Sequence, residues 1–416
     1  MAIDSNKIKV LVIFLYLFLL ALYMLILPFG DEPDFARVAP KYIDFLNLFQ
    51  ISYFDGSIKI IDNVDPRGWF GYEFYAVSSC KYLSNAYQFF GIYDFGSCFQ
   101  GYSLALKRTL LTLLIYLPLL VVAFKNSKSQ STKNTLLFKD FFISNQSFQL
   151  CFLFPGFIYF SSVFSHEQVT LMLSVLFIYF LFKAKYIFAI VIFSIFYLID
   201  TGNAIVVLVA SCYVIGSLII CRKLSFVWFI LLNFSLVLLV YFLSTDLLYI
   251  FESFHPYISL KIEALDEAKS ISADVSNKYP LWSRPLMTFL SYNFMAPAYS
   301  KHLLLYLVVS FGVSYTIYKH FILTAHNSVG LQYIASLLAV FSFVSMVVFI
   351  LPGHVNAKYF IFTLPFIINL FNYYYSYITL VKFFLMLNVI VLLDYLLFYM
   401  IGCEDKSCFS FFGVPF

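Results

Sequence analysis

Charged residues are scarce in this chain of 416 residues. Asp, Glu, Lys and Arg together make up 12% of the sequence, whereas hydrophobic residues make up 62% and the mean hydropathy is +0.88. Soluble domains carry about a quarter charged residues. So little polar surface excludes a soluble globular protein and predicts an integral membrane protein. The net charge of +4 says little about partners, because in a membrane protein the positions of the charges in the loops matter more.

Several motifs are also absent. The sequence has no G-x-G-x-x-G pattern, no phosphate-binding loop, no basic groove for nucleic acid and no Cys/His spacing typical of zinc. These absences argue against a soluble nucleotide site and against a nucleic-acid partner. Phe and Tyr are abundant instead, with 53 and 33 copies, and we interpret most of them as lipid-facing side chains.

Apolar runs of about 17–25 residues are long enough to cross a bilayer as helices. Eleven runs of roughly this kind predict an all-α polytopic protein with about eleven transmembrane helices in a single integral membrane domain, residues 1–416. The first run is followed by the acidic GDEP and not by a small-residue cleavage site, which argues against a cleaved signal peptide. The predicted spans are 8–28, 108–124, 147–164, 168–183, 186–200, 203–221, 225–244, 302–318, 330–351, 358–374 and 382–401.

Lys and Arg collect in alternate loops, and this asymmetry predicts the orientation. The short loops 161–167, 200–203 and 351–357 contain neither residue. The long segments 29–107 and 245–301, with the C-terminal tail, are therefore expected outside the cytoplasmic (inner) membrane, and the N-terminus in the cytoplasm. The basic residues assigned to the inner side are Lys7, Lys9, Lys125, Lys128, Lys133, Lys139, Lys183, Lys185, Arg222, Lys223, Lys319 and Lys382.

The first outer segment contains apolar side chains at helical spacing over 37–50 and again over 72–90. This pattern predicts amphipathic helices on the membrane surface. Four cysteines also fall on the outer side, where disulfides form in an oxidising compartment. Three pairings are possible, free thiols are the alternative, and the sequence does not choose among them. The disulfide candidates are Cys80, Cys98, Cys403 and Cys408.

Two adjacent carboxylates, Asp31 and Glu32, follow the first apolar run directly. Charge so close to hydrocarbon is costly unless it has a partner or a function. Further polar residues occur at the starts of later spans on the same predicted outer side, in SHEQ and in GHVNAKYF. Because the inner loops are short and basic, any site for chemistry is expected at the outer face.

The order of these features resembles the GT-C superfold of membrane glycosyltransferases. DEPDFAR is similar to the first-loop motif of bacterial members, although Asp34 stands where those often have His. SHEQ before an apolar run resembles their second-loop motif. GHVNAKYFIFTLP resembles their late RY…P motif, with Lys358 in place of Arg. The resemblance covers most of the chain as an architecture and about 25 residues as sequence.

This resemblance implies an enzyme that moves a sugar from a polyprenyl-phosphate-type lipid donor to an acceptor at the outer membrane face, usually with inversion. It implies that a carboxylate in the first outer loop removes the acceptor proton and that basic residues bind the lipid phosphate. The acceptor is a glycan, a lipid or a protein. The sequence identifies neither the donor sugar, the acceptor, the linkage nor the oligomeric state.

Adjacent side chains on a helix or turn point about 100° apart, so one carboxylate of the pair faces a cavity while the other binds a backbone amide or a metal. We expect Asp31 to be the base, with Glu32 as the next choice. A helix cap with a solvated charge pair is the alternative. Glu167 is the second catalytic candidate, although an acid in the first turn is also favoured by the helix dipole. The sequence assigns no metal; Asp31 and Glu167 suit only a hard cation such as Mg²⁺ or Mn²⁺.

Basic side chains on the outer side are the candidates for binding the lipid phosphate. Lys358 and His354 lie four residues apart and share a face if the helix already begins there, and Lys358 would then project from a helix N-terminus, where anions bind readily. A lysine that reaches lipid headgroups is the alternative. Arg67 in DPRGW, Arg284 in WSRP and His166 complete the substrate-binding candidates.

Two other classes of function remain open. An O-antigen or capsule polymerase has a similar size and uses lipid-linked substrates; in that case Arg67 and Arg284 matter more than Asp31. A transporter or lipid flippase is the second alternative. Transporters tend to have internal repeats, broken spans and ionisable groups near the midplane, whereas this chain has no visible repeat and almost no charge in the middle of its spans.

Overall fold

The structure, a computed structural model, is helical throughout the part of the chain that it describes. Helix accounts for 91% of that part, and no strand occurs in it. The described residues are 5–26, 105–125, 143–162, 166–254, 280–286, 288–289, 315, 328–351 and 357–402. The predicted surface helices over 37–50 and 72–90 lie outside these residues, and so does the predicted span 302–318 except for Tyr315.

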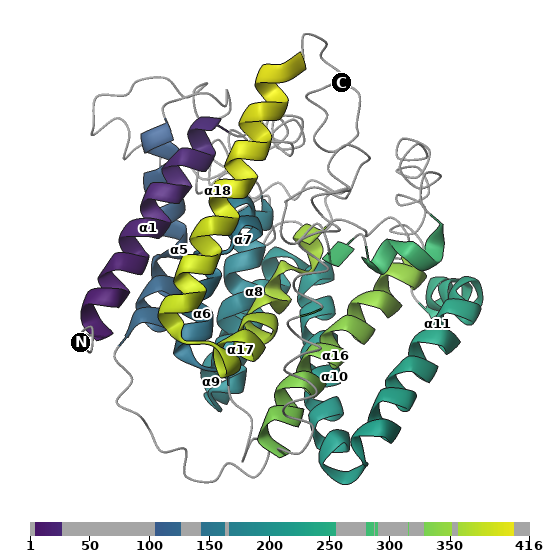
Figure 1. The fold of residues 1–416 in the computed structure, drawn as a ribbon. Helices are drawn as coiled ribbons and strands as arrows, with labels where there is room; N and C mark the ends of the chain where they lie inside the picture. Colours follow the sequence, from purple (N-terminus) through teal and green to yellow (C-terminus); the bar gives the residue numbers. More distant parts are fainter. Residues whose placement is uncertain are drawn as a thin grey trace, which may run out of the picture.

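The helices pack side by side as a bundle (Figure 1), which agrees with the predicted all-α fold. Three helical segments in the described part are long and apolar enough to cross a membrane, namely Thr201–Lys223, Phe226–Ser244 and Gly330–Ile350, and six apolar helices are shorter. The chain is therefore a helical, membrane-associated protein. The helices are α1 (Ser5–Ile26), α5 (Ala105–Phe124), α6 (Asn145–Cys151), α7 (Pro155–Ser162), α8 (His166–Phe182), α9 (Tyr186–Ile199), α10 (Thr201–Lys223), α11 (Phe226–Phe254), α16 (Ser328–Ile350), α17 (Leu364–Tyr374) and α18 (Tyr377–Gly402).

Helix α16 occupies the centre of one half of the bundle and packs against α10, α11 and α17. Helix α11 lies at the periphery, since only 11% of its apolar segment is buried and Phe242 is 73% exposed. Large apolar side chains exposed in this way are unfavourable in water. They are favourable where hydrocarbon covers them, in agreement with the membrane association.

The predicted span 147–164 is not one helix. It forms α6 and α7, which are separated by residues 152–154. Pro155 explains the break, because its ring excludes the helical conformation from the preceding residue and its missing N–H is harmless only at a helix start. The backbone turns tightly here through the hydrogen bonds from Leu153 N to Leu150 O and from Phe154 N to Cys151 O, both 3.0 Å.

Asn388 of α18 stabilises this break from the opposite side. Its fully buried side chain donates to the carbonyl oxygens of Leu153 (2.8 Å) and Phe384 (2.7 Å), and its Oδ1 accepts from the hydroxyl of Tyr23 on α1 (2.7 Å). The break leaves a backbone carbonyl without a helical partner, and an unpaired carbonyl is costly where water is absent. One side chain therefore ties α1 and α18 to the interrupted helix.

Three other boundaries differ from the predicted ones. Helix α11 continues to Phe254, ten residues beyond the predicted span 225–244 and into the segment 245–301 that was assigned to an outer loop. Helix α18 begins at Tyr377 and not at 382. The predicted span 358–374 begins as two short 3₁₀ turns, η3 (Ala357–Tyr359) and η4 (Ile361–Thr363), before α17 starts at Leu364.

The turn between α8 and α9 contains a strained residue. Ala184 has φ = 55°, in the left-handed region that glycine adopts without a steric penalty. The turn is closed by hydrogen bonds from Lys183 N to Tyr179 O (3.0 Å), from Ala184 N to Leu181 O (3.1 Å) and from Lys185 N to Phe180 O (2.9 Å). These bonds hold Ala184 in a conformation that its Cβ opposes.

We predict that Ala184→Gly stabilises the protein by about 1 kcal/mol, because glycine removes the cost of the left-handed conformation. Ala189→Gly in α9 is the matched control and should destabilise the protein by a similar amount, since glycine weakens a helix interior. Thermal unfolding of both purified variants in the same detergent measures the difference. Equal shifts in the same direction would contradict the assignment of Ala184.

A second prediction concerns Asn388. Asn388→Leu should destabilise the protein by about 1–3 kcal/mol, because it leaves a buried carbonyl and the Tyr23 hydroxyl without their partner. Tyr23→Phe should cost less, and the double variant should cost less than the sum of the two single changes. Met386→Leu, on the exposed side of the same helix, serves as the control. Additive effects in the thermal unfolding of these variants would show that Tyr23 and Asn388 are not coupled.

Candidate functional site

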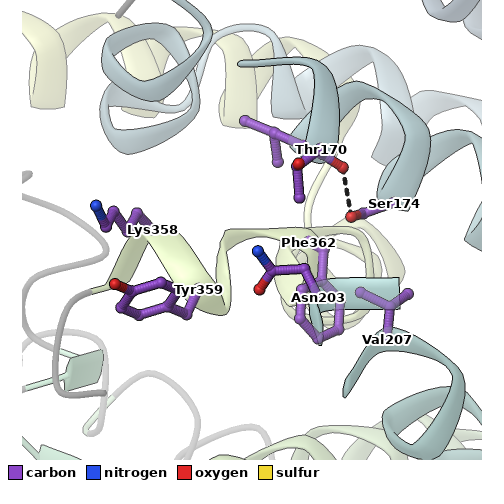
Figure 2. Close-up of a pocket in the computed structure, with 8 residues that line it drawn as sticks. Thr170, Ser174, Asn203, Val207, Lys358, Tyr359 and Phe362 are labelled. Atoms are coloured by element: carbon purple, nitrogen blue, oxygen red, sulfur yellow. Dashed lines mark hydrogen bonds between the residues drawn. The ribbon is translucent and has the colours of Figure 1, made fainter. Parts of the chain in front are cut away.

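A pocket lies where the starts of α8 and α10 meet the 3₁₀ turns before α17 (Figure 2). Its cavity volume is about 20 Å³, and the pocket is partly open to the outside. In Figure 2 Lys358 and Tyr359 lie on one side of the pocket, and Thr170, Ser174 and Asn203 lie on the other. The lining residues are Thr170, Leu171, Ser174, Asn203, Val207, Lys358, Tyr359 and Phe362.

We call Thr170, Ser174 and Asn203 the polar wall of this pocket. Asp200 lies behind the wall and binds two of these side chains. It is the single residue between α9 and α10, and its Oδ1 caps α10 by accepting from the backbone N–H of Asn203 (3.1 Å). Its Oδ2 accepts from the side-chain amide of Asn203 (2.6 Å) and from the hydroxyl of Thr170 on α8 (3.2 Å). The carboxylate thus joins α8 to the start of α10. The sequence had placed Gly202 in a loop, but Asp200 starts the helix early enough that Gly202 lies in its first turn.

The directions of the hydrogen bonds in this wall determine whether donors or acceptors remain for a ligand. Thr170 Oγ1 and Asn203 Nδ2 both donate to Asp200, and Ser174 Oγ donates to the backbone oxygen of Thr170 (2.5 Å). Asn203 Oδ1 has no hydrogen-bond partner within the described part of the chain. The wall therefore presents mainly acceptors, which suit the hydroxyl groups of a ligand.

Lys358 supplies the positive charge of the pocket. Its side chain is half-buried, and its Nζ lies 5.2 Å from the centroid of the Tyr359 ring. The predicted position of Lys358 at the N-terminus of a long helix is wrong, because Lys358 lies in η3 and α17 begins six residues later. Pro365, in the first turn of α17, favours a helix start at that point.

The two sides of the pocket are chemically complementary to one kind of ligand. An ammonium group only donates and carries a full charge, so it binds an anion or a strong acceptor. Tyr359 and Phe362 add aromatic side chains to the lining of the pocket. A ligand that carries both an anionic group and hydroxyl groups matches this arrangement.

Two further predicted site residues begin α8. His166 is its first residue, and Glu167 lies three residues before Thr170 in the same helix. This spacing brings position 167 within one helical turn of the pocket wall. Arg284 is half-buried at the end of a 3₁₀ turn, η2 (Leu281–Ser283), and is not among the residues that line the pocket.

The remaining candidates lie outside the described residues. They are Asp31, Glu32, Arg67, His354, Cys80, Cys98, Cys403 and Cys408. Their proposed roles therefore stay predictions. Within the described ranges, no group of three or more His, Cys, Asp or Glu side chains is arranged to hold a metal ion.

Most residues of the polar wall were not predicted from the sequence. Thr170 and Ser174 lie four residues apart, so they share one face of an otherwise apolar helix, and this spacing was a usable signal. The pattern DTGN at 200–203 is typical of a helix start, since Asp is a favoured N-cap residue. Neither pattern indicates by itself that α8 and α10 meet.

Comparison of the chain with protein-family models, with curated proteins and with solved structures finds no match. The fold and the pocket therefore carry the functional argument. Together they define a helical membrane-associated protein with a small pocket at one end of the bundle, and this pocket is lined by a lysine and by hydroxyl and amide side chains.

We predict that Asp200→Ala destabilises the protein by about 1–2 kcal/mol, because α10 loses its cap and α8 loses its link to α10. Asp200→Asn should cost less, since the amide oxygen still accepts from the backbone of Asn203. Thermal unfolding measures both variants. Equal losses of stability in Asp200→Ala and Asp200→Asn would mean that the negative charge of Asp200 stabilises the protein, and not its hydrogen bond to the helix start.

Proposed function

We propose that this protein is a membrane glycosyltransferase of the GT-C type. It moves a sugar from a polyprenyl-phosphate-type lipid donor to a glycan, lipid or protein acceptor at the outer face of the cytoplasmic membrane. The pocket carries this proposal, because Lys358 suits a phosphate and the wall of Thr170, Ser174 and Asn203 suits sugar hydroxyls. A glycosyl phosphate contains both kinds of group.

The proposed topology has about eleven spans, with the N-terminus in the cytoplasm and the segments 29–107 and 245–301 outside. The arrangement of charge supports this orientation. The described basic residues Lys125, Lys183 and Lys185 lie at the ends of α5 and α8, whereas the pocket lies at the opposite end of α8. The donor would then enter the pocket from the outer leaflet.

The transfer step follows from the chemistry of a glycosyl phosphate. A carboxylate, Asp31 in our assignment, removes the proton from the acceptor hydroxyl. The acceptor oxygen then forms a bond to the anomeric carbon while the bond from that carbon to the phosphate oxygen breaks. The lipid phosphate leaves with the electron pair, and Lys358 stabilises its increased negative charge. Glu167 orients the base, Glu32 is the next choice for the base itself, and attack from the opposite face inverts the anomeric centre.

The positive charge of Lys358 gives the first functional prediction. Lys358→Gln should lower kcat/KM for a polyprenyl-phosphate sugar by about 30-fold or more, since losing a charged partner of phosphate costs at least about 2 kcal/mol. Lys358→Arg should retain part of the activity, and Lys382→Gln at the opposite end of the bundle should retain all of it. Transfer assays on purified protein with a panel of lipid-linked sugars, with and without chelator, test this. Full activity of Lys358→Gln would exclude the proposed phosphate site.

The proposed base requires a separate test. Asp31→Asn should lower the rate of transfer by about 10²–10⁴-fold, the range for loss of a general base, while membrane insertion stays normal. Retained transfer in Asp31→Asn combined with loss in Arg67→Gln would favour a polysaccharide polymerase instead. Loss of transfer in Arg284→Gln would favour the polymerase in the same way, and Lys382→Gln at the opposite end of the bundle is the control.

Transport is a second candidate because of the broken segment α6–α7. Interrupted helices often form the binding sites of transporters. Here the break is occupied by buried side chains such as Phe152 and bonded by Asn388, which favours a static element. Liposomes that contain the purified protein separate the two functions, since a flippase moves a labelled polyprenyl lipid across the bilayer without forming a glycosidic bond.

A further inference from the structure

Only a small group fits into the pocket between α8, α10 and the 3₁₀ turns before α17 (Figure 2). The cavity volume is about 20 Å³, and about 10–15 Å³ is already enough for one water molecule. A sugar ring is much larger than a water molecule. The pocket therefore accepts one substituent of a ligand, while the rest of that ligand lies at the open side.

Asp200 fixes the orientation of the Asn203 side chain. A carboxylate has only acceptors, so the amide nitrogen Nδ2 of Asn203 must face the Oδ2 of Asp200, at 2.6 Å. The reversed amide would bring two oxygens to that short distance. The Oδ1 of Asn203 is thereby directed away from Asp200, and it has no hydrogen-bond partner within the described part of the chain. Because Asn203 lines the pocket, this oxygen remains as an acceptor for a ligand.

The two hydroxyl groups of the polar wall already use their hydrogens. Thr170 Oγ1 donates to Asp200 Oδ2 (3.2 Å), and Ser174 Oγ donates to the backbone oxygen of Thr170 (2.5 Å). A hydroxyl has one hydrogen and two lone pairs, so both oxygens only accept from a ligand. Together with Asn203 Oδ1, the wall presents three acceptor oxygens against the one remaining amide hydrogen of Asn203.

This balance favours a ligand group that carries a hydrogen. An unsubstituted hydroxyl is small enough for the pocket and donates to an acceptor of the wall. An alkylated or acylated oxygen is larger and has no hydrogen to donate, and a fluorine atom in place of the hydroxyl lacks the hydrogen without being larger. A site that hydrogen-bonds a hydroxyl discriminates against such analogues, because polar groups of the site are then left unpaired.

We propose that the pocket binds one unsubstituted hydroxyl group of the donor sugar, and that Asp200 determines this selectivity by holding Thr170 and Asn203 as acceptors. The identity of the ligand as a sugar on a lipid phosphate rests on the proposed function. The polar wall contacts the hydroxyl. Asp200 is a positioning residue, because it acts through Thr170 and Asn203 and not on the sugar.

Asp200→Asn provides the sharpest test, because it should reverse the hydrogen bonding of the wall. The oxygen of the introduced amide is needed by the backbone N–H of Asn203, so the nitrogen of that amide faces the side chains that donated to Asp200. Asn203 then turns its oxygen toward this nitrogen and its own Nδ2 toward the pocket. The hydroxyl hydrogen of Thr170 is released as well. Donors now outnumber acceptors, and the preference for a hydroxyl should disappear.

Equilibrium binding to the purified full chain in detergent measures this preference. Polyprenyl-phosphate glucose, mannose and galactose are compared first, and the sugar that binds most tightly is then tested with each of its hydroxyls replaced in turn by fluorine. At one position of the sugar, the fluoro derivative should bind the wild type about 10-fold or more weakly, as expected for a lost hydrogen bond to the wall. In Asp200→Asn the same derivative should bind as well as the parent sugar.

Two further variants complete the test. Thr170→Val removes one acceptor with little change in size, so it should reduce the selectivity, and it replaces Asp200→Asn if that variant does not fold. Thr201→Val is the matched control and should keep the selectivity, because Thr201 donates to the Tyr197 oxygen (2.9 Å) at the same helix start and does not line the pocket.

The proposal is overturned if no position, or more than one, shows this behaviour, if Asp200→Asn and Thr170→Val both keep the selectivity, or if Thr201→Val loses it. Binding of all three sugars no tighter than that of polyprenyl phosphate alone would also exclude it. Transfer assays with the same compounds separate it from the proposed function. Transfer without selectivity excludes the hydroxyl pocket and leaves the glycosyltransferase unaffected, whereas selective binding without transfer excludes the glycosyltransferase and leaves the hydroxyl pocket.

Discussion

Polar groups shielded from water must find hydrogen-bond partners, and this constraint shapes the whole described bundle. Its effect is clearest at the interruption between α6 and α7. Pro155 prevents a continuous helix, and the carbonyl of Leu153 then accepts from Asn388, which also accepts from Tyr23. The interruption is thus stabilised by helices that are distant in sequence. Its hydrogen bonds connect the first, middle and last helices of the chain.

The same constraint builds the pocket. Helix α10 begins after a single connecting residue, so its first N–H groups need a cap. Asp200 provides the cap and uses its second oxygen to bind Thr170 and the side chain of Asn203. A requirement of helix formation thereby fixes two polar side chains on a common wall. Lys358 reaches the same space from a 3₁₀ turn that precedes α17.

Charge divides the molecule into two ends with different chemistry. The pocket is lined by Lys358 and by hydroxyl and amide groups, and the carboxylate of Asp200 binds Thr170 and Asn203 behind this lining. The opposite end contains Lys125, Lys183, Lys185, Arg222 and Lys223 and no acid of the described helices.

The sequence by itself determined the membrane class, the helical fold and most helix positions, because apolar composition and run length depend only on local residues. It also located Lys358, which lines the pocket. It did not determine that 147–164 is interrupted, that α11 extends to Phe254 or that α17 begins only at Leu364. Above all, it did not identify Thr170, Ser174 and Asn203 as one polar wall. Only the tertiary structure decided this, since the wall exists because α8 packs beside the start of α10, and such packing depends on contacts between residues 30 positions apart.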